Sequence, residues 1–152
     1  VQATTSGTTI TFGSIPSWAV QITLSFSGVS TNGTNDILIQ LGDAGGPENS
    51  GYLSSTTVVS NAAATIAGNY TTGFGLPGGA ATNVYHGSIT FTLVSAAAFT
   101  WSAAGLIGLS NGATIATIAG SKALSAALDR VAITTVGGTD AFDLGLMNII
   151  YS

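Results

Sequence analysis

The sequence contains no cysteine and very few charged residues. The absence of cysteine excludes disulfides, thiolate metal sites and cysteine nucleophiles. Asp, Glu, Lys and Arg make up 5% of the 152 residues, whereas about 25% is usual in soluble proteins. Lys122 and Arg130 are the only Lys and Arg residues, and a nucleic-acid interface needs many such side chains to neutralise phosphates. We therefore expect no nucleic-acid partner.

Long hydrophobic runs are also missing, although no Asp, Glu, Lys or Arg occurs from residue 49 to residue 121. The most apolar window covers only residues 93–109, is interrupted by Ser and Thr, and has no flanking basic residues. A spanning helix needs about 20 strongly apolar residues, so we expect no membrane insertion. The first residues lack the basic segment and apolar core of a signal peptide. Val rather than Met at position 1 is consistent with a fragment or the end of a longer protein.

Alternating apolar residues are the main structural signal. Residues 18–26 place Trp18, Val20, Ile22, Leu24 and Phe26 on one face and polar side chains on the other. Similar or shorter buried patterns occupy residues 8–12, 37–41, 88–94, 128–136 and 142–151, with weaker ones at 99–107 and 114–118. Turn-forming Gly dipeptides separate these segments, and no helical stripe appears. The pattern predicts an all-β fold: a single antiparallel β-sandwich, jelly-roll-like, over residues 1–152.

Three local expectations follow from this strand pattern. Trp18 belongs to an apolar face and is predicted to lie in the core. Asp129 and Arg130 are adjacent in a predicted strand, so their side chains should point to opposite faces and not pair. Residues 42–79 interrupt the clear strand pattern. A stretch of that length is either a functional loop or contains weak strands.

Two motifs resemble enzyme signatures. GDAGGP at residues 42–47 matches a serine-protease nucleophile loop with Ala44 in the place of the nucleophile. The only histidine, His86, follows this loop, whereas the catalytic base should precede it. GFGLPG at residues 73–78 matches the dinucleotide-binding GxGxxG pattern, but no helical pattern follows it. Both motifs are better explained as glycine-rich turns, and we expect a structural role for His86.

The acidic residues form two main groups. Asp36, Asp43 and Glu48 bracket the strand at residues 37–41, and loop carboxylates of this kind can bind calcium. Asp140 and Asp143 precede the last strand, and two carboxyl groups about 5–9 Å apart can hydrolyse glycosides. Turn formation and solubility also explain both groups. Since no motif supplies an activated nucleophile or an acid–base pair, we expect no enzyme activity and no cofactor, and the calcium site stays an open alternative.

Segments spread over most of the chain share one pattern. They are SIPSWAVQITLSFSGVS (14–30), TNGT (31–34), LIQLGDAGGPE (38–48), GY (51–52), TTGFG (71–75), HGSITFTL (86–93) and LDRVAITTVGGTDAFDLGLMNI (128–149). In this order they resemble a domain of bacteriophage and prophage proteins, mostly at the distal end of tail fibres or related virion proteins. The chain departs from that pattern at Ala132, where a basic residue is common, at Gly137, where Asn is common, and most over residues 99–118. The resemblance implies a β-structured, homotrimeric virion component exposed to a host surface.

This resemblance and the composition lead to one functional expectation and two alternatives. We expect a tail-fibre tip domain that contacts other virion proteins and binds a host-surface receptor, either a glycan or a protein. A mean hydropathy of +0.53 also favours burial of surface between subunits. The alternatives are a purely structural trimerisation, decoration or baseplate module and, less favoured, a tailspike-like glycan hydrolase.

The candidate receptor-binding residues lie in the segment at residues 42–79. Tyr52 and Tyr70 are predicted to offer aromatic rings for stacking, and Asn49 and Asn69 to offer hydrogen-bonding groups.

Overall fold

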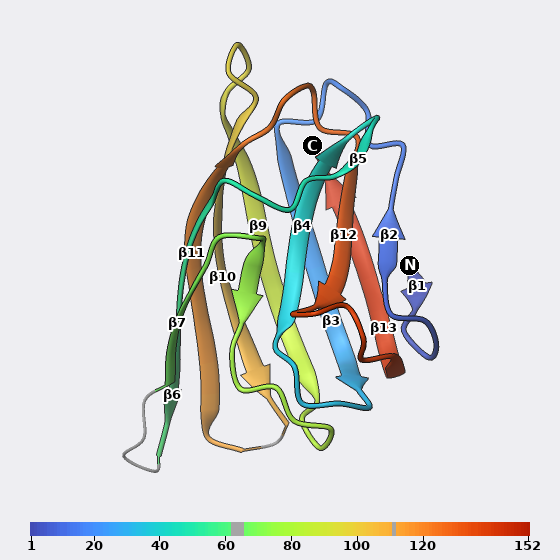
Figure 1. The fold of residues 1–152 in the computed structure, drawn as a ribbon, viewed down its shortest axis with the longest axis vertical. Coiled ribbons are helices and arrows are strands. Elements are labelled where there is room, and N and C mark those ends of the chain that lie inside the picture. The colour runs from blue at the N-terminus through green and yellow to red at the C-terminus, as the bar shows by residue number, and fades with distance from the viewer. Residues whose placement is uncertain (62–65, 111) are drawn as a thin grey trace.

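The computed structural model describes residues 1–61, 66–110 and 112–152, and over these residues the chain forms antiparallel strands and no helix. Two sheets pack face to face (Figure 1). The larger sheet has the strand order β1-β13-β3-β9-β10-β11-β6-β7, and the smaller has the order β2-β12-β4-β5, with β8 also paired to β4. The predicted all-β, sandwich-like domain is therefore confirmed. No helix that could cross a bilayer occurs in the described part of the chain.

The strand bounds account for the strong sequence patterns. The larger sheet contains β1 (Gln2–Ala3), β3 (Gln21–Thr31), β6 (Tyr52–Ser60), β7 (Ile66–Tyr70), β9 (Tyr85–Ser95), β10 (Thr100–Leu109), β11 (Thr114–Ala123) and β13 (Phe142–Tyr151). The smaller sheet contains β2 (Ile10–Phe12), β4 (Ile37–Asp43), β5 (Gly46–Pro47), β8 (Phe74–Leu76) and β12 (Arg130–Thr135). Each segment that the alternation predicted, including the weaker ones at residues 99–107 and 114–118, contains a strand.

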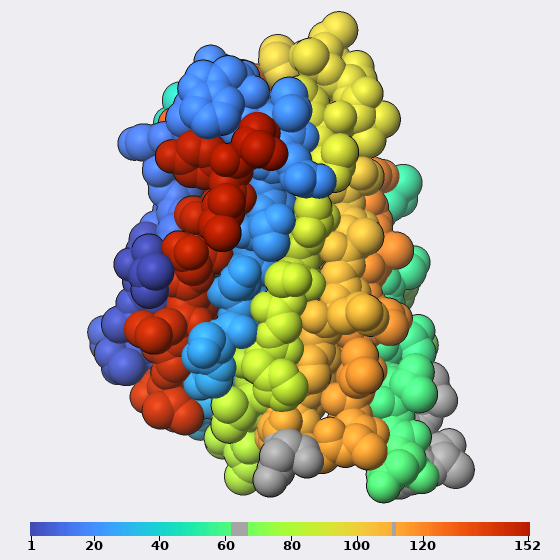
Figure 2. Space-filling view, turned by 180° about the vertical axis from the view of Figure 1, so that it is seen from behind, coloured from blue at the N-terminus to red at the C-terminus, as the bar shows by residue number. Residues whose placement is uncertain are grey.

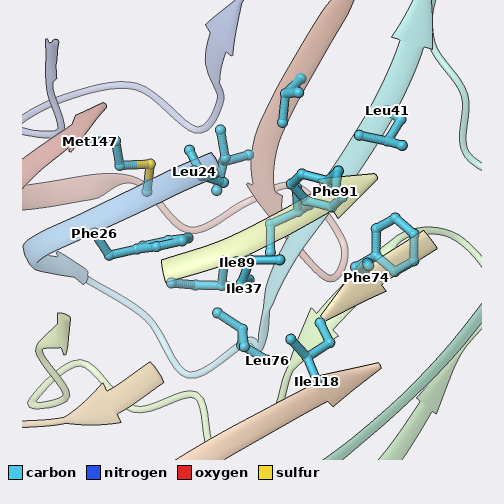
Figure 3. Packing of buried hydrophobic residues seen from close by; sticks show 14 of the residues in the cluster. Leu24, Phe26, Ile37, Leu41, Phe74, Leu76, Ile89, Phe91, Ile118 and Met147 are labelled. Atoms are coloured by element: carbon cyan, nitrogen blue, oxygen red, sulfur yellow. The ribbon is translucent and has the colours of Figure 1, made fainter. Parts of the chain in front are cut away.

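One hydrophobic core fills the space between the sheets. In β3, Ile22 and Leu24 are fully buried, whereas Thr23 between them lies on the opposite face. Figure 3 shows how Leu24 and Phe91 of the larger sheet meet apolar side chains of the smaller one. Close packing of these side chains holds the two layers together. The opposite face of the larger sheet lies on the molecular surface (Figure 2).

The segment at residues 42–79 is not a long loop, because it contains β5, β6, β7 and β8. In β6 the inward positions include Ser54 and Thr56, which are small, polar and buried. Thr56 donates a hydrogen bond to the Gly75 carbonyl (2.7 Å), and Ser54 accepts one from the Gly75 N–H (3.4 Å). Polar residues of β6 therefore occupy core positions, where they form hydrogen bonds with β8. For this reason the sequence of β6 does not show the alternation of apolar and polar residues that marks the other strands.

Two further local expectations are wrong. Trp18 is 63% exposed rather than in the core, because β3 begins only at Gln21 and a turn closed by Ala19 N–H and the Pro16 carbonyl precedes it. Arg130 does pair with Asp129, at 2.7 Å between Nη2 and Oδ2. Asp129 lies before the first residue of β12, so strand alternation does not separate the two side chains.

Several connections meet at one end of the sandwich, which lies uppermost in Figure 1. Backbone hydrogen bonds join them: Ile15 to Asp129, Leu124 to Phe99, and Val20 to Ser152. The residues before β3, the β9–β10 turn, the β11–β12 connection and the C-terminus thus form one continuous surface. We call it the upper end.

Candidate functional site

Tyr52 is not a stacking platform. Only 1% of the residue is exposed, and its ring packs edge-on against Phe74 at 5.1 Å between ring centroids. Its hydroxyl accepts a hydrogen bond from the Leu41 N–H (2.8 Å) and can donate to the carbonyls of Glu48 (2.9 Å) or Leu41 (3.1 Å). Burial raises the pKa of this phenol, so it stays protonated. Tyr52 therefore links β6 of the larger sheet to β4 of the smaller one.

We expect Tyr52→Phe to lower the free energy of unfolding by about 1–3 kcal/mol, because the buried Leu41 N–H loses its acceptor. Urea denaturation of both proteins measures the change. Thr11→Val is a suitable control, since Thr11 is exposed in β2 of the smaller sheet. Equal stability of Tyr52→Phe and the parent protein would contradict the linking role.

Tyr70 and the two asparagines do not gather into one site. Tyr70 is half-buried, lies against Gly75, and donates a hydrogen bond from its hydroxyl to Asp36 Oδ2 (2.8 Å). Burial, and secondarily the Asp36 carboxylate, raises the pKa of Tyr70. Asn69 is exposed and lies opposite Ser55 in the ladder between β7 and β6, whereas the exposed Asn49 precedes β6. Asn49 and Asn69 can offer hydrogen bonds to a ligand, but from different segments of the chain.

The three calcium candidates are also separated. Asp36 precedes β4 and accepts hydrogen bonds from Tyr70 and from the Gly79 N–H (2.9 Å), whereas Asp43 ends the same strand. Asp43 and Glu48 do meet, since each lies 2.8 Å from the Ser125 hydroxyl. Within the described residues, no group of three or more His, Asp or Glu side chains is placed to hold a metal ion.

Asp43 and Glu48 belong to a cluster with Lys122, Ser125 and Tyr52, which we call the charged clasp. Lys122 Nζ lies 2.5 Å from Glu48 Oε2, 5.4 Å from the centroid of the Tyr52 ring, and donates to the Ala123 carbonyl (2.7 Å). Burial tends to raise the pKa of Glu48, but hydrogen bonds from Lys122 and Ser125 outweigh it and hold that pKa below its ordinary value. The hydrogen bond from Ser125, followed by that from the Gly45 N–H, lowers the pKa of Asp43.

Asp140 and Asp143 are hydrogen-bonded to different segments of the chain. Asp140 accepts hydrogen bonds from the backbone N–H (2.8 Å) and the side chain (2.7 Å) of Asn35. The backbone hydrogen bond is the main reason that the pKa of Asp140 is lowered, whereas a general acid needs a raised one. Asp143 accepts a hydrogen bond from the Ser30 hydroxyl. Each carboxylate is thus bound to a different part of β3 or of the β3–β4 connection.

His86 has a structural contact instead of a catalytic partner among the described residues. Its ring lies over Gly108, where a Cβ atom would come within 2.3 Å of the imidazole. Nε2 lies 2.6 Å from the Ser110 carbonyl. This arrangement agrees with the structural role expected from the sequence.

The upper end carries exposed aromatic residues that the sequence pattern did not identify as surface. The Trp18 and Tyr151 rings meet at 5.7 Å between centroids, with 63° between their planes. Beside them in the chain, Pro16 and Ser17 line an apolar cavity of about 250 Å³ together with Leu93, Phe99, Trp101 and Leu128. Pro16 could have indicated that Trp18 is exposed. A proline seldom lies inside a central strand, so Pro16 predicts that the residues next to it form a turn.

Phe99, which lines the cavity, has an unusual backbone conformation. Phe99 in the β9–β10 turn has a φ of 47°, a conformation that bulky residues rarely adopt. Such conformations persist where the surrounding structure requires them, and they cluster at binding sites. No charged residue lines this cavity. Aromatic and apolar surfaces of this kind bind the C–H face of a sugar or an apolar side chain.

Comparison of the chain with family models, curated proteins and solved structures finds no match.

Proposed function

We propose that this chain is a non-enzymatic attachment domain at the distal end of a bacteriophage tail fibre, and that it binds a receptor on the host surface. The ordered resemblance to distal virion domains supports this proposal. The structural observation that carries it is the exposed Trp18–Tyr151 pair beside an open apolar cavity at the upper end. Loops held by a rigid sandwich are the usual place for recognition.

The chemistry of the upper end favours an uncharged ligand group. Trp18 offers a large, rigid aromatic surface, and the neighbouring cavity can accept a small apolar substituent. Because no carboxylate or basic group lines the cavity, a charged ligand group would lose hydration there without gaining a partner. A neutral sugar of a surface glycan or an apolar loop of a receptor protein fits these conditions.

The proposed domain works as part of an assembly. In this proposal the chain forms a homotrimer in the virion, attached to other virion proteins, and the upper ends of three copies bind the host together. The low content of charge and the mean hydropathy of +0.53 support burial of further surface between copies. Several weak sites in one trimer would strengthen attachment through multivalency.

Replacing Trp18 by alanine should weaken binding of the purified domain to cells of a permissive host by about ten- to a hundredfold. The reason is the loss of the largest exposed aromatic surface at the upper end. Titration of fluorescently labelled protein onto cells measures the affinity.

The matched control is Val136→Ala, an exposed apolar residue in the turn after β12, which should bind like the parent protein. If Trp18→Ala folds and binds like the parent, the upper end is not the site. If the parent binds no cells from a permissive host, a purely structural virion module becomes the better proposal.

A further inference from the structure

The larger sheet has an outer face formed by the side chains of β3, β9, β10, β11 and β6 that point away from the smaller sheet (Figure 2). The strand register places Thr23, Thr90, Ala104, Ala119 and Ser55 in one row across it. Side chains of this size leave the sheet surface shallow. The outer face is therefore broad, without a deep groove or a prominent ridge along its central row.

The outer face carries almost no charge. The structure describes all five strands, and Lys122 is the only Lys, Arg, Asp or Glu residue in them. Its side chain points inward and is buried. The only histidine of the chain, His86, also lies in one of these strands. The six acidic residues lie in other strands or in connections. A chain with a net charge of −4 thus keeps all its Asp, Glu, Lys and Arg side chains off this face.

Large apolar side chains stand on the same face. Leu106 and Ile115 are exposed on neighbouring strands, and Leu53 and Val59 are exposed on β6. Water contact with these side chains is unfavourable, and a surface of this kind is typical of a contact between proteins. The polar groups between them are short hydroxyls, which lose little on burial when they find a hydrogen-bond partner.

We propose that the outer face of the larger sheet packs against another copy of this chain. A second copy fits this face because two copies that each carry −4 repel one another least where neither presents an Asp, Glu, Lys or Arg side chain. The area is of the right size: five strands of this length cover about 700 Å², which lies within the roughly 600–1,000 Å² per partner of a standard stable interface. This inference deepens the assembly proposed above and rests on it only for the expected number of three copies.

The test uses a charge placed at the centre of the face. Ala104→Glu and Ala119→Glu each put a carboxylate on the central row, where it would be buried between copies. Ala44→Glu adds the same charge at an exposed position in the β4–β5 turn and is the control. The mass by light scattering should be three times 15.0 kDa for the parent and the control. Each central variant should dissociate at least a hundredfold more readily.

A second measurement does not depend on the charged variants folding. The sequence has no cysteine, so a single thiol introduced as Ala104→Cys can form a disulfide only between copies. Oxidation should link two chains in Ala104→Cys and leave Ala44→Cys unlinked. Linked chains support the face assignment even where the glutamate variants fail to fold.

The outcomes separate this inference from the proposed function. A parent protein that is monomeric at micromolar concentration overturns the inference, as do central glutamate variants that fold and assemble like the parent. A dimer that both glutamate variants dissociate supports the face and contradicts the proposed trimer. If Ala104→Glu is monomeric and still binds cells, the upper end recognises the receptor independently of assembly. If Ala104→Glu keeps the mass of the parent but loses binding of a glycan, the outer face is a glycan-binding surface and the inference is overturned.

Discussion

Replacing Phe74 by alanine is expected to lower the free energy of unfolding by about 3–5 kcal/mol, the range for truncating a buried aromatic side chain. Phe74 is fully buried in β8. Its ring contacts Tyr52 of β6 at 5.1 Å and Phe91 of β9 at 5.5 Å between centroids. A single side chain of the smaller sheet thus packs against two strands of the larger one, and its removal leaves a cavity between the layers.

Urea denaturation measures this loss, and Val136→Ala provides the control because that apolar side chain is exposed. The control should change stability by less than about 0.5 kcal/mol. An equally small effect of Phe74→Ala would mean that residues 74–76 behave as a surface loop, one of the two alternatives that the interrupted strand pattern left open, rather than as part of the core.

Phe74 also shows where the sequence stops predicting the fold. The eight longer or more regular strand segments follow from alternation, because an inward Ile, Leu or Phe at every second position can be recognised in isolation. β8 is three residues long and contains Gly75, so it has no period to recognise. β6 has Ser54 and Thr56 at inward positions, and their burial makes sense only with Gly75 as hydrogen-bond partner. A strand cannot be identified from its local pattern when its inward residues are polar and form their hydrogen bonds with the backbone of a distant segment.

The candidate site was predictable to a smaller extent. Aromatic residues were expected to bind the receptor, but the sequence could not show which rings are exposed. Tyr52 is buried because its hydroxyl finds the backbone of Leu41 and Glu48, whereas Trp18 is exposed because a turn at Pro16 delays the start of β3. Both outcomes depend on how strands meet in space. Alternation specifies the face of a residue only inside a strand, and Trp18 and Asp129 both lie just before one.

The charged clasp could not be predicted from the sequence either, because its residues come from segments that are distant along the chain. The packing of the sheets brings together Lys122 in β11 and Glu48 before β6, and the buried Lys122 ammonium lies over the Tyr52 ring. An isolated buried charge is costly, so a partner for Lys122 is a physical requirement. Six acidic residues were available in the sequence, and only the fold decides which of them lies within reach.

Replacing Lys122 by methionine should therefore lower the free energy of unfolding by about 3 kcal/mol at neutral pH. The Lys122 side chain is 6% exposed and that of Glu48 21%, so the variant leaves a partly buried carboxylate without its cation. The Ala123 carbonyl also loses its hydrogen-bond donor. A double variant with Glu48→Gln removes the unpaired charge and should recover part of the loss, because a neutral amide needs no counterion.

The same pair predicts how this difference depends on pH. The pKa of Glu48 in the folded protein lies below its ordinary value of 4.5, so the stability that the ion pair contributes is present above that value and is lost as the pH falls through the lower folded pKa. In Lys122→Met the contribution of Lys122 to the lowered pKa is gone, whereas burial and the two hydrogen bonds from Ser125 remain, so protonation of Glu48 destabilises the fold less than in the parent protein. Asp43 and Asp140, whose pKa values are also lowered, are present in both proteins and largely cancel in the difference. Urea unfolding at about pH 7 and about pH 3 should show the gap between parent and variant narrowing in acid; a gap that stays constant would mean that Lys122 stabilises the fold by packing alone.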